Sequence, residues 1–306
     1  MKSSPHILVI GNCTVDLSFR VPRFARAGET ILATEKSVDL GGKGANQAVA
    51  AARFGATVSL AAPIGRDTDG EWALSRLLAE GVSCKDLLRT DTATDLSLIY
   101  VTPGGENSIV STHDAAANAS AGWVRAVVEA APRDTISLLQ GNLPLETTLA
   151  ALKACRQRGL ATVLNPAPIQ YAYDSIFPFT DILIVNETEA MDLGRRADAV
   201  SSAEALQSGG IPTVIVTLGA KGAVAFSDGR TIRVASAPVA ALDTVGAGDT
   251  FCGALAAMLG RGAGLQSAMQ VAVDAATLSV TRRGTQSAFP SPQEARGLMS
   301  RYGTEA

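Results

Sequence analysis

Histidine is scarce in this 306-residue chain, which contains only His6 and His113. This scarcity excludes the HExxH metalloprotease motif and most histidine-centred metal sites. The chain also has no G-x-S-x-G elbow, and a Ser-His-Asp triad would depend on one of these two histidines. We expect His113 at the surface or the edge of a pocket. Catalysis must therefore rely on carboxylates, amides, lysine and backbone groups.

Cysteine, basic charge and long apolar runs are also limited. The formal net charge of −3 argues against a nucleic-acid or anionic-membrane partner, which would need a basic surface. No apolar run approaches the roughly 18 residues of a membrane span, so we expect a cytoplasmic protein. The cysteines form neither a CxxC pair nor a dense disulfide framework, and free, mostly buried thiols are expected. The four are Cys13, Cys84, Cys155 and Cys252.

Short apolar runs alternate with helical patterns along most of the chain. With 47% hydrophobic and 18% charged residues, the composition is that of a globular protein with a large core. Strands are predicted at residues 7–10, 58–62, 135–140, 161–164, 181–185 and 213–218. Helices are predicted at residues 43–54, 70–80, after 120, and at 144–158, 187–193, 203–207 and 290–302. This α/β alternation predicts one domain over residues 1–306, a three-layer, doubly wound, mostly parallel sheet with helices on both faces.

Two regions break the alternation, at residues 14–40 and 95–113. The first contains predicted strands at 17–21 and 30–34, and the second reads as two strands joined by a Pro-Gly-Gly-Glu-Asn turn. They predict a small separate β-sheet. It could form a lid that excludes water from the site, or an edge extension used as a dimer contact.

Polar residues follow several predicted strands, where open α/β sheets bind their ligands. Any one of them could be a helix cap or a turn residue, but their shared location favours a site. They are Asn12, Asp16, Asn142, Asn165, Asn186, Glu189, Thr217 and Gly219.

A glycine cluster at residues 41–47 runs directly into an alanine-rich helical pattern. Its glycines allow close approach of a polar ligand, while Lys43 and Asn46 supply donors for sugar or phosphate oxygens. It is neither a Walker A loop nor a Rossmann fingerprint, because the required residues and spacing are missing. The alternative is a glycine-rich turn before a surface helix.

A second glycine turn precedes Asp249, in the run Asp243-Thr-Val-Gly-Ala-Gly-Asp. A glycine turn that opens a helix leaves backbone N–H groups free and adds the positive end of the helix dipole, which together bind anions. A carboxylate beside such a site is explained if it removes a proton from a hydroxyl that attacks a phosphoryl group. The alternative is that Asp249 only caps the helix while Gly246 and Gly248 form a tight turn.

These motifs resemble the signatures of the ribokinase family of carbohydrate kinases, also called the phosphofructokinase B family. The resemblance spans the whole chain and includes the NxxE pattern at residues 186–189. It implies that Asp249 is the base and that the N–H groups of Gly246, Ala247 and Gly248 stabilise the transferring phosphoryl group.

The resemblance also implies the other ligand contacts. It implies ATP and water-mediated Mg²⁺ at Asn186 and Glu189. A monovalent cation, K⁺, would bind Asp243 and the carbonyls of Val245 and Val280. A homodimer formed through the lid is implied as well. The sugar would contact Asp16, Gly42, Lys43, Asn46, Asn142 and Asp249, and the nucleotide would contact Asn186, Thr217, Gly219, Lys221 and Gly248.

Four positions depart from the family pattern. Thr14 stands where ribokinases carry Asn, and Asn142 stands where they carry an acidic residue, so the set of sugar hydroxyls that is recognised should differ. Val273 replaces a polar adenine contact, and Ala288 replaces a hydroxyl near the cation. We expect an ATP-dependent sugar kinase, with D-ribose converted to ribose 5-phosphate. Fructose, a deoxy sugar, a nucleoside or other ribosyl heterocycle, or a non-catalytic sugar-binding role remain alternatives.

Overall fold

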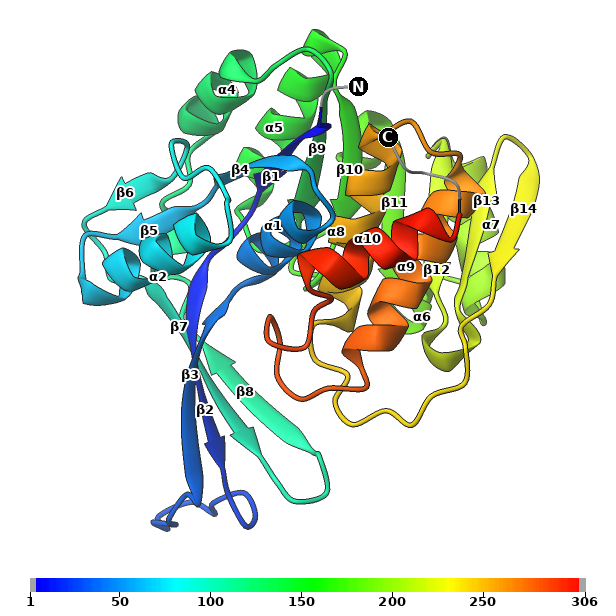
Figure 1. Cartoon of the computed structure of the whole chain (residues 1–306). Coiled ribbons are helices and arrows are strands. Elements are labelled where there is room, and N and C mark those ends of the chain that lie inside the picture. Colours follow the sequence, from blue (N-terminus) through cyan, green and yellow to red (C-terminus); the bar gives the residue numbers. More distant parts are fainter. Residues whose placement is uncertain (1–3, 303–306) are drawn as a thin grey trace.

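The computed structural model describes residues 4–302, and an eight-stranded sheet lies at its centre (Figure 1). The strand order is β14-β13-β12-β11-β10-β9-β1-β4. All neighbours pair in parallel except β13, which is antiparallel to both β12 and β14. The predicted mostly parallel sheet is confirmed. The strands are β1 (His6–Ile10), β4 (Thr57–Ala61), β9 (Thr135–Gln140), β10 (Ala161–Asn165), β11 (Ile182–Asn186), β12 (Thr213–Thr217), β13 (Ala223–Ser227) and β14 (Arg230–Val234).

Helices cover both faces of this sheet, as predicted (Figure 1). One face carries α1 (Lys43–Arg53), α2 (Thr68–Ala79), α8 (Ala247–Gly260), α9 (Leu265–Ser279) and α10 (Pro292–Ser300). The other carries α4 (Ala121–Ala130), α5 (Leu145–Arg158), α6 (Glu187–Gly194) and α7 (Ala199–Ser208). Shorter helical turns are α3 (Asp114–Ala117), η1 (Phe177–Phe179) and η2 (Gly219–Lys221). In residues 4–302, no helix has the length and apolar character needed to cross a membrane.

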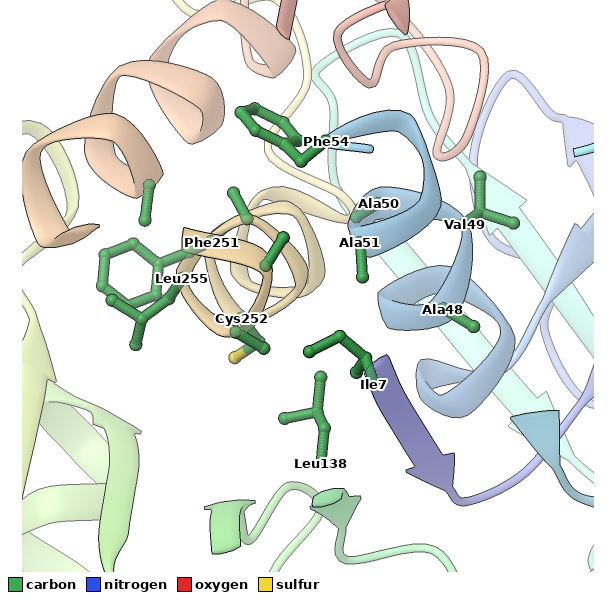
Figure 2. Close-up of a cluster of buried hydrophobic side chains, with 14 of the residues drawn as sticks. Ile7, Ala48, Val49, Ala50, Ala51, Phe54, Leu138, Phe251, Cys252 and Leu255 are labelled. Atoms are coloured by element: carbon green, nitrogen blue, oxygen red, sulfur yellow. The ribbon is translucent and has the colours of Figure 1, made fainter. Parts of the chain in front are cut away.

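The core forms two layers because successive side chains of a strand point to opposite faces. In β1, Ile7 packs into one hydrophobic cluster and Leu8 into the other. Figure 2 shows the first cluster, where Ala51 of α1 and Cys252 of α8 point toward the sheet. Small residues let these two helices approach closely: a Cβ at Gly253 would lie 2.6 Å from the carbonyl oxygen of Gln47. This packing brings the first turns of α1 and α8 together.

A second sheet has the order β3-β2-β7-β8 and extends away from the body of the molecule (Figure 1). We call it the small sheet. Every residue of β8 is exposed, whereas the residues of β2 and β7 are buried or partly buried. Its strands are β2 (Thr14–Arg20), β3 (Glu35–Gly41), β7 (Asp95–Val101) and β8 (Asn107–Ser111). A two-stranded sheet of β5 (Pro63–Gly65) and β6 (Leu88–Thr90) lies elsewhere, and the sequence did not predict it.

One predicted strand of the small sheet is wrong. Residues 30–34 form no strand, and Leu32 is 84% exposed. The partner of β2 is instead the polar segment β3, with Leu17 opposite Val38. Ile31 and Leu32 suggested a strand by their apolar character. The ladder with β2 begins only after Thr34, whose N–H donates to the carbonyl of Arg20.

Most other predicted elements are confirmed to within a few residues, and all four cysteines are free, with Cys84 only partly buried. Helix α9 and the β13–β14 hairpin were missed. The hairpin turns at Asp228-Gly229, where both residues have positive φ angles of 50° and 69°. An Asp-Gly pair between alternating strands is a strong hairpin signal, so the sequence did contain the necessary information.

Candidate active site

Two cavities adjoin where the chain enters α8. The first has a volume of about 330 Å³ and lies between the small sheet and the residues that precede α8. The second has a volume of about 290 Å³ and is bounded by the end of β12, η2, α8 and α9. Ala241 and Thr244 line both cavities. Two ligands bound in them would therefore meet at the start of α8.

The turn into α8 depends on glycine. Gly246 is the N-cap residue with φ 77°, and a Cβ there would lie 2.8 Å from Phe289 Cε1. A larger residue would be both strained and sterically blocked. The Ala247 N–H lies 3.4 Å from the carbonyl oxygen of Thr244, while Gly248 lines the second cavity. The first turn of this 14-residue helix therefore presents backbone N–H groups and a positive dipole end toward the second cavity.

Asp249 lies in the first turn of α8 and is 5% exposed. Its Oδ2 accepts a hydrogen bond from Asn46 Nδ2 at 3.0 Å, and its Oδ1 accepts one from Gln47 Nε2 at 3.0 Å. Helix α8 has no side-chain cap. The capping alternative for Asp249 is therefore wrong, because its carboxylate binds amides of α1 instead of its own helix. Each oxygen keeps a lone pair for a further donor.

The glycine cluster brings three predicted sugar contacts to the same place. Gly42 has φ 86°, and a Cβ there would lie 2.9 Å from the backbone of Cys13 and Thr14. This close approach directs Lys43 and Asn46, at the start of α1, toward Asp249. The negative charge of Asp249 raises the pKa of Lys43, which keeps the ammonium group charged.

Asp16 lies on β2, not in the turn after β1, and lines the first cavity. The Thr14 hydroxyl donates to Asp16 Oδ1 at 2.7 Å. Burial raises the pKa of Asp16, and the nearby charges of Asp39 and Asp249 raise it further, although hydrogen bonds from Thr14 and Ser97 oppose the change. A carboxylate held this way is a strong acceptor for sugar hydroxyls.

Asn142 lines neither cavity, and the same is true of Gly42, Lys43, Asn46 and Asp249. The carbonyl oxygen of Asn142 lies 2.7 Å from Nε2 of His113, whose side chain is exposed as predicted. The Oδ1 atom of Asn142 is buried and has no hydrogen-bond partner in the part of the chain that the structure describes. The predicted contact between Asn142 and a sugar remains a prediction.

Asn186 and Glu189 form the capping box of α6. The Glu189 N–H donates to Asn186 Oδ1 at 2.8 Å, and the Asn186 N–H donates to Glu189 Oε2 at 2.9 Å. Asn186 is exposed and Glu189 is partly exposed, and Oε1 of Glu189 is left for another ligand. In residues 4–302, no cluster of three or more acidic, His or Cys residues could enclose a metal ion. This donor set fits Mg²⁺ that keeps its waters and binds nucleotide phosphates, because magnesium needs few protein ligands.

Only some of the nucleotide contacts predicted from the sequence line the second cavity. Thr217, Gly219 and Gly248 line the second cavity, together with Val273. Lys221 is exposed and does not line it, although its neighbours Ala220 and Gly222 do.

The predicted cation ligands lie around Asp243. Its Oδ1 accepts from the Val245 N–H and its Oδ2 accepts from the Gly284 N–H, both at 3.0 Å. The Val280 carbonyl is 2.8 Å from the Leu242 nitrogen and 3.3 Å from that of Asp243. Asp243 and Val280 are thus adjacent, but these N–H groups already use part of the carbonyl's capacity as an acceptor.

Sequence reasoning gave no role to several residues of the site. Asp39 and Arg283 line the first cavity, and Gln47 contacts Asp249 directly. Gln47 carried a usable signal, because it is a polar residue inside an otherwise small and apolar buried helical stretch. No sequence pattern indicated a role for Asp39 or Arg283. Asp39 lies on the small sheet and Arg283 in the loop after α9, and only the folded chain brings these two elements together.

Known carbohydrate kinases resemble this chain over nearly its whole length. Residues 4–292 match the pfkB family carbohydrate kinase model. A ribokinase from Haemophilus influenzae is 34% identical over 94% of this chain and 96% of its own length. A deoxyribokinase from Salmonella typhi is 32% identical over 96% of this chain and 98% of its own. The structure of Arabidopsis thaliana ribokinase complexed with ribose and ATP is 26% identical, with a TM-score of 0.86 over 97% of this chain and 99% of that one.

The chain belongs to the pfkB family of carbohydrate kinases. It is a sugar kinase, as the two signature motifs predicted.

Proposed function

We propose that this kinase transfers the γ-phosphoryl group of ATP to the primary hydroxyl of D-ribose and so produces ribose 5-phosphate. The similarity to ribokinases, including one whose structure holds ribose and ATP, supports this substrate pair. The observation that carries the proposal is the position of Asp249. Its carboxylate lies between the sugar-side residues of α1 and the phosphate-binding turn of α8.

The reaction follows from that position. Asp249 accepts the proton of the sugar hydroxyl while the hydroxyl oxygen forms its bond to the γ-phosphorus and the bond to the departing ADP oxygen breaks. The N–H groups of Gly246, Ala247 and Gly248 and the helix dipole stabilise the charge on the transferring group. Lys43 adds a positive charge beside the carboxylate. Asp16 and Asn46 orient the sugar, and Thr217 and Gly219 line the nucleotide side.

Two ions complete the proposal. Mg²⁺, bound through water at Glu189 and Asn186, would neutralise charge on the nucleotide phosphates. A K⁺ ion at Asp243, Val245 and Val280 would add positive charge near the start of α8. In this proposal the ions neutralise charge, and the protein groups only hold the ions in position.

The charges of the first cavity favour a neutral sugar over a sugar phosphate. Four carboxylates line it, and one of the two guanidinium groups, that of Arg20, is paired with Glu35 at 3.0 Å. An anionic substrate would meet net repulsion here. The four carboxylates belong to Asp16, Glu35, Asp39 and Asp243.

A deoxy sugar is a second candidate, and Thr14 favours it. The Thr14 hydroxyl is buried and donates to Asp16, so its single hydrogen is not available to the sugar. Ribokinases carry an amide at this position, which has two donor hydrogens. With one hydrogen-bond donor fewer for the sugar, the site should lose less activity when the sugar lacks a hydroxyl.

A phosphorylation panel tests both candidates. We expect ADP release with ribose or 2-deoxyribose, and a kcat/KM for either sugar that exceeds those for fructose, fructose 6-phosphate and nucleosides at least tenfold. The ratio between ribose and 2-deoxyribose decides between the two candidates, and Thr14→Asn should raise that ratio. Nucleotide binding without turnover of any sugar would support the non-catalytic alternative instead. Removal of Mg²⁺ with EDTA should abolish turnover, and replacement of K⁺ by a bulky organic cation should lower it.

A further inference from the structure

Buried side-chain amides lie directly behind Asp249. Gln47 is 0% exposed and uses both hydrogens of its Nε2. One is donated to Asp249 Oδ1 at 3.0 Å and the other to Asn165 Oδ1 at 3.3 Å. Its own Oε1 accepts from Gln140 Nε2 at 2.8 Å. Gln47 therefore belongs to a continuous hydrogen-bonded network that ends on the carboxylate.

The network fixes which atom of Gln47 faces Asp249. Because Gln140 donates to Oε1, a flip of the Gln47 amide would bring two donors together and would place an acceptor against the carboxylate. Asn165 is fixed in the same way, since its Nδ2 donates to the carbonyl of Ile184 at 3.0 Å. Gln140 and Asn165 are the last residues of the buried strands β9 and β10. The orientation of Gln47 is thus set by the rigid sheet.

Gln47 differs from its neighbour Asn46, which binds the other oxygen of Asp249. Asn46 belongs to the sugar-side group, and its Oδ1 accepts from Gln286 in the loop before α10 at 2.9 Å. Gln47 is fully buried, and its hydrogen-bond partners are Asp249, Asn165 and Gln140. Of these three, Asp249 is the one to which the proposed function gives a part in the reaction.

We propose that Gln47 is a positioning residue for the base. Its donated hydrogen bond holds Oδ1 so that the carboxylate keeps one rotamer. Because Gln140 and Asn165 fix the orientation of the Gln47 amide, Gln47 can only donate a hydrogen bond to Asp249. The inference rests on the proposed function, in which Asp249 takes the proton of the sugar hydroxyl.

The variant Gln47→Leu tests it. We expect kcat to fall about 10²-fold, since a misplaced base loses much of its effect, while KM for sugar and ATP changes less than threefold. The control is Thr162→Val, at the opposite end of β10, which loses partly buried hydrogen bonds to Phe179 and Asp181. It should lower stability without a change in kcat.

A double-mutant cycle separates this inference from the proposed function. In an Asp249→Asn background, Gln47→Leu should lower kcat less than twofold further, because the group on which it acts is gone. A full additional 10²-fold loss, or a change in KM alone, would overturn the role of Gln47. If Asp249→Asn alone kept near-normal turnover, the assignment of the base would fail instead.

Gln140→Leu provides a second route if Gln47→Leu does not fold. It removes the bond that orients Gln47 and a longer bond, at 3.4 Å, to the Leu138 carbonyl. We expect a smaller loss of kcat than in Gln47→Leu, with KM again nearly unchanged. An unchanged kcat in a folded Gln140→Leu protein would contradict the proposal.

Discussion

The surroundings of Asp249 and the small sheet differ in how deeply their side chains are buried. Around Asp249, the side chains from α1, β9 and β10 are buried, and together with the partly buried Gln286 before α10 they form a hydrogen-bonded network. In the small sheet, every residue of β8 is exposed, and β3 is exposed at Glu35, Lys36 and Val38. The difference indicates a division of labour. The buried network holds Asp249, while the small sheet contributes Asp16 and Asp39, which are partly exposed at the first cavity.

The largest expected effect is on the buried side. Asp249→Asn keeps the shape of the side chain but cannot accept the proton, so kcat should fall roughly 10³- to 10⁴-fold. ATP binding, measured by calorimetry, should be nearly unchanged. Asp274→Asn on α9 is the control, because it also alters a partly buried hydrogen-bonded carboxylate, away from both cavities. Near-normal turnover of Asp249→Asn would show that the buried network does not serve proton transfer.

The turn before α8 should give the next largest effect. Gly246→Ala forces a side chain into a left-handed conformation and against Phe289 and Thr285, so kcat should fall about 10- to 100-fold as the N–H groups shift. Gly262→Ala is a matched control at the other end of α8. Gly262 has φ 81°, but nothing lies near its Cβ position. Both variants should lose about 1 to 2 kcal/mol of stability, and only Gly246→Ala should lose activity.

The contribution of the small sheet is tested by Asp16→Asn. Loss of a charged acceptor should raise the sugar KM about tenfold or more, with a smaller effect on kcat. The same change should stabilise the free protein at pH 7 and raise its Tm. The raised pKa of Asp16 means that the folded state disfavours its ionised form, so the ionised carboxylate lowers stability at neutral pH.

The advantage of Asp16→Asn should shrink as the pH falls through the raised pKa and should vanish below the ordinary value of 3.8. Thermal melts from pH 3 to 8 with and without sugar measure both effects. An unchanged KM for the sugar would show that Asp16 does not bind it.

The smallest expected effect concerns self-association through the small sheet. Val110 on β8 is 62% exposed, and a dimer formed there would bury it. Val110→Ser should weaken association about tenfold in sedimentation experiments. Leu78→Ser on α2, where the leucine is 56% exposed, should leave association unchanged. Equal effects of the two variants would argue against a dimer through this sheet.

The sequence predicted the buried region better than the small sheet. Strand β9 and the turn before α8 were predicted because apolar periodicity and glycine chemistry are local signals. Strand β3 was misplaced because its partner, β2, sets its position and its own residues are polar. The contact between Gln47 and Asp249 joins residues 202 positions apart, so no local pattern could predict it.

Residues 235–246, which connect β14 to α8, contain no helix or strand. Because Ala241 and Thr244 of this connection line both cavities, it is a common wall between the two substrates. A sugar that displaces this wall also reshapes the space for the nucleotide. The two substrates should therefore bind cooperatively, and each should alter the affinity of the other by the same factor, whichever binds first.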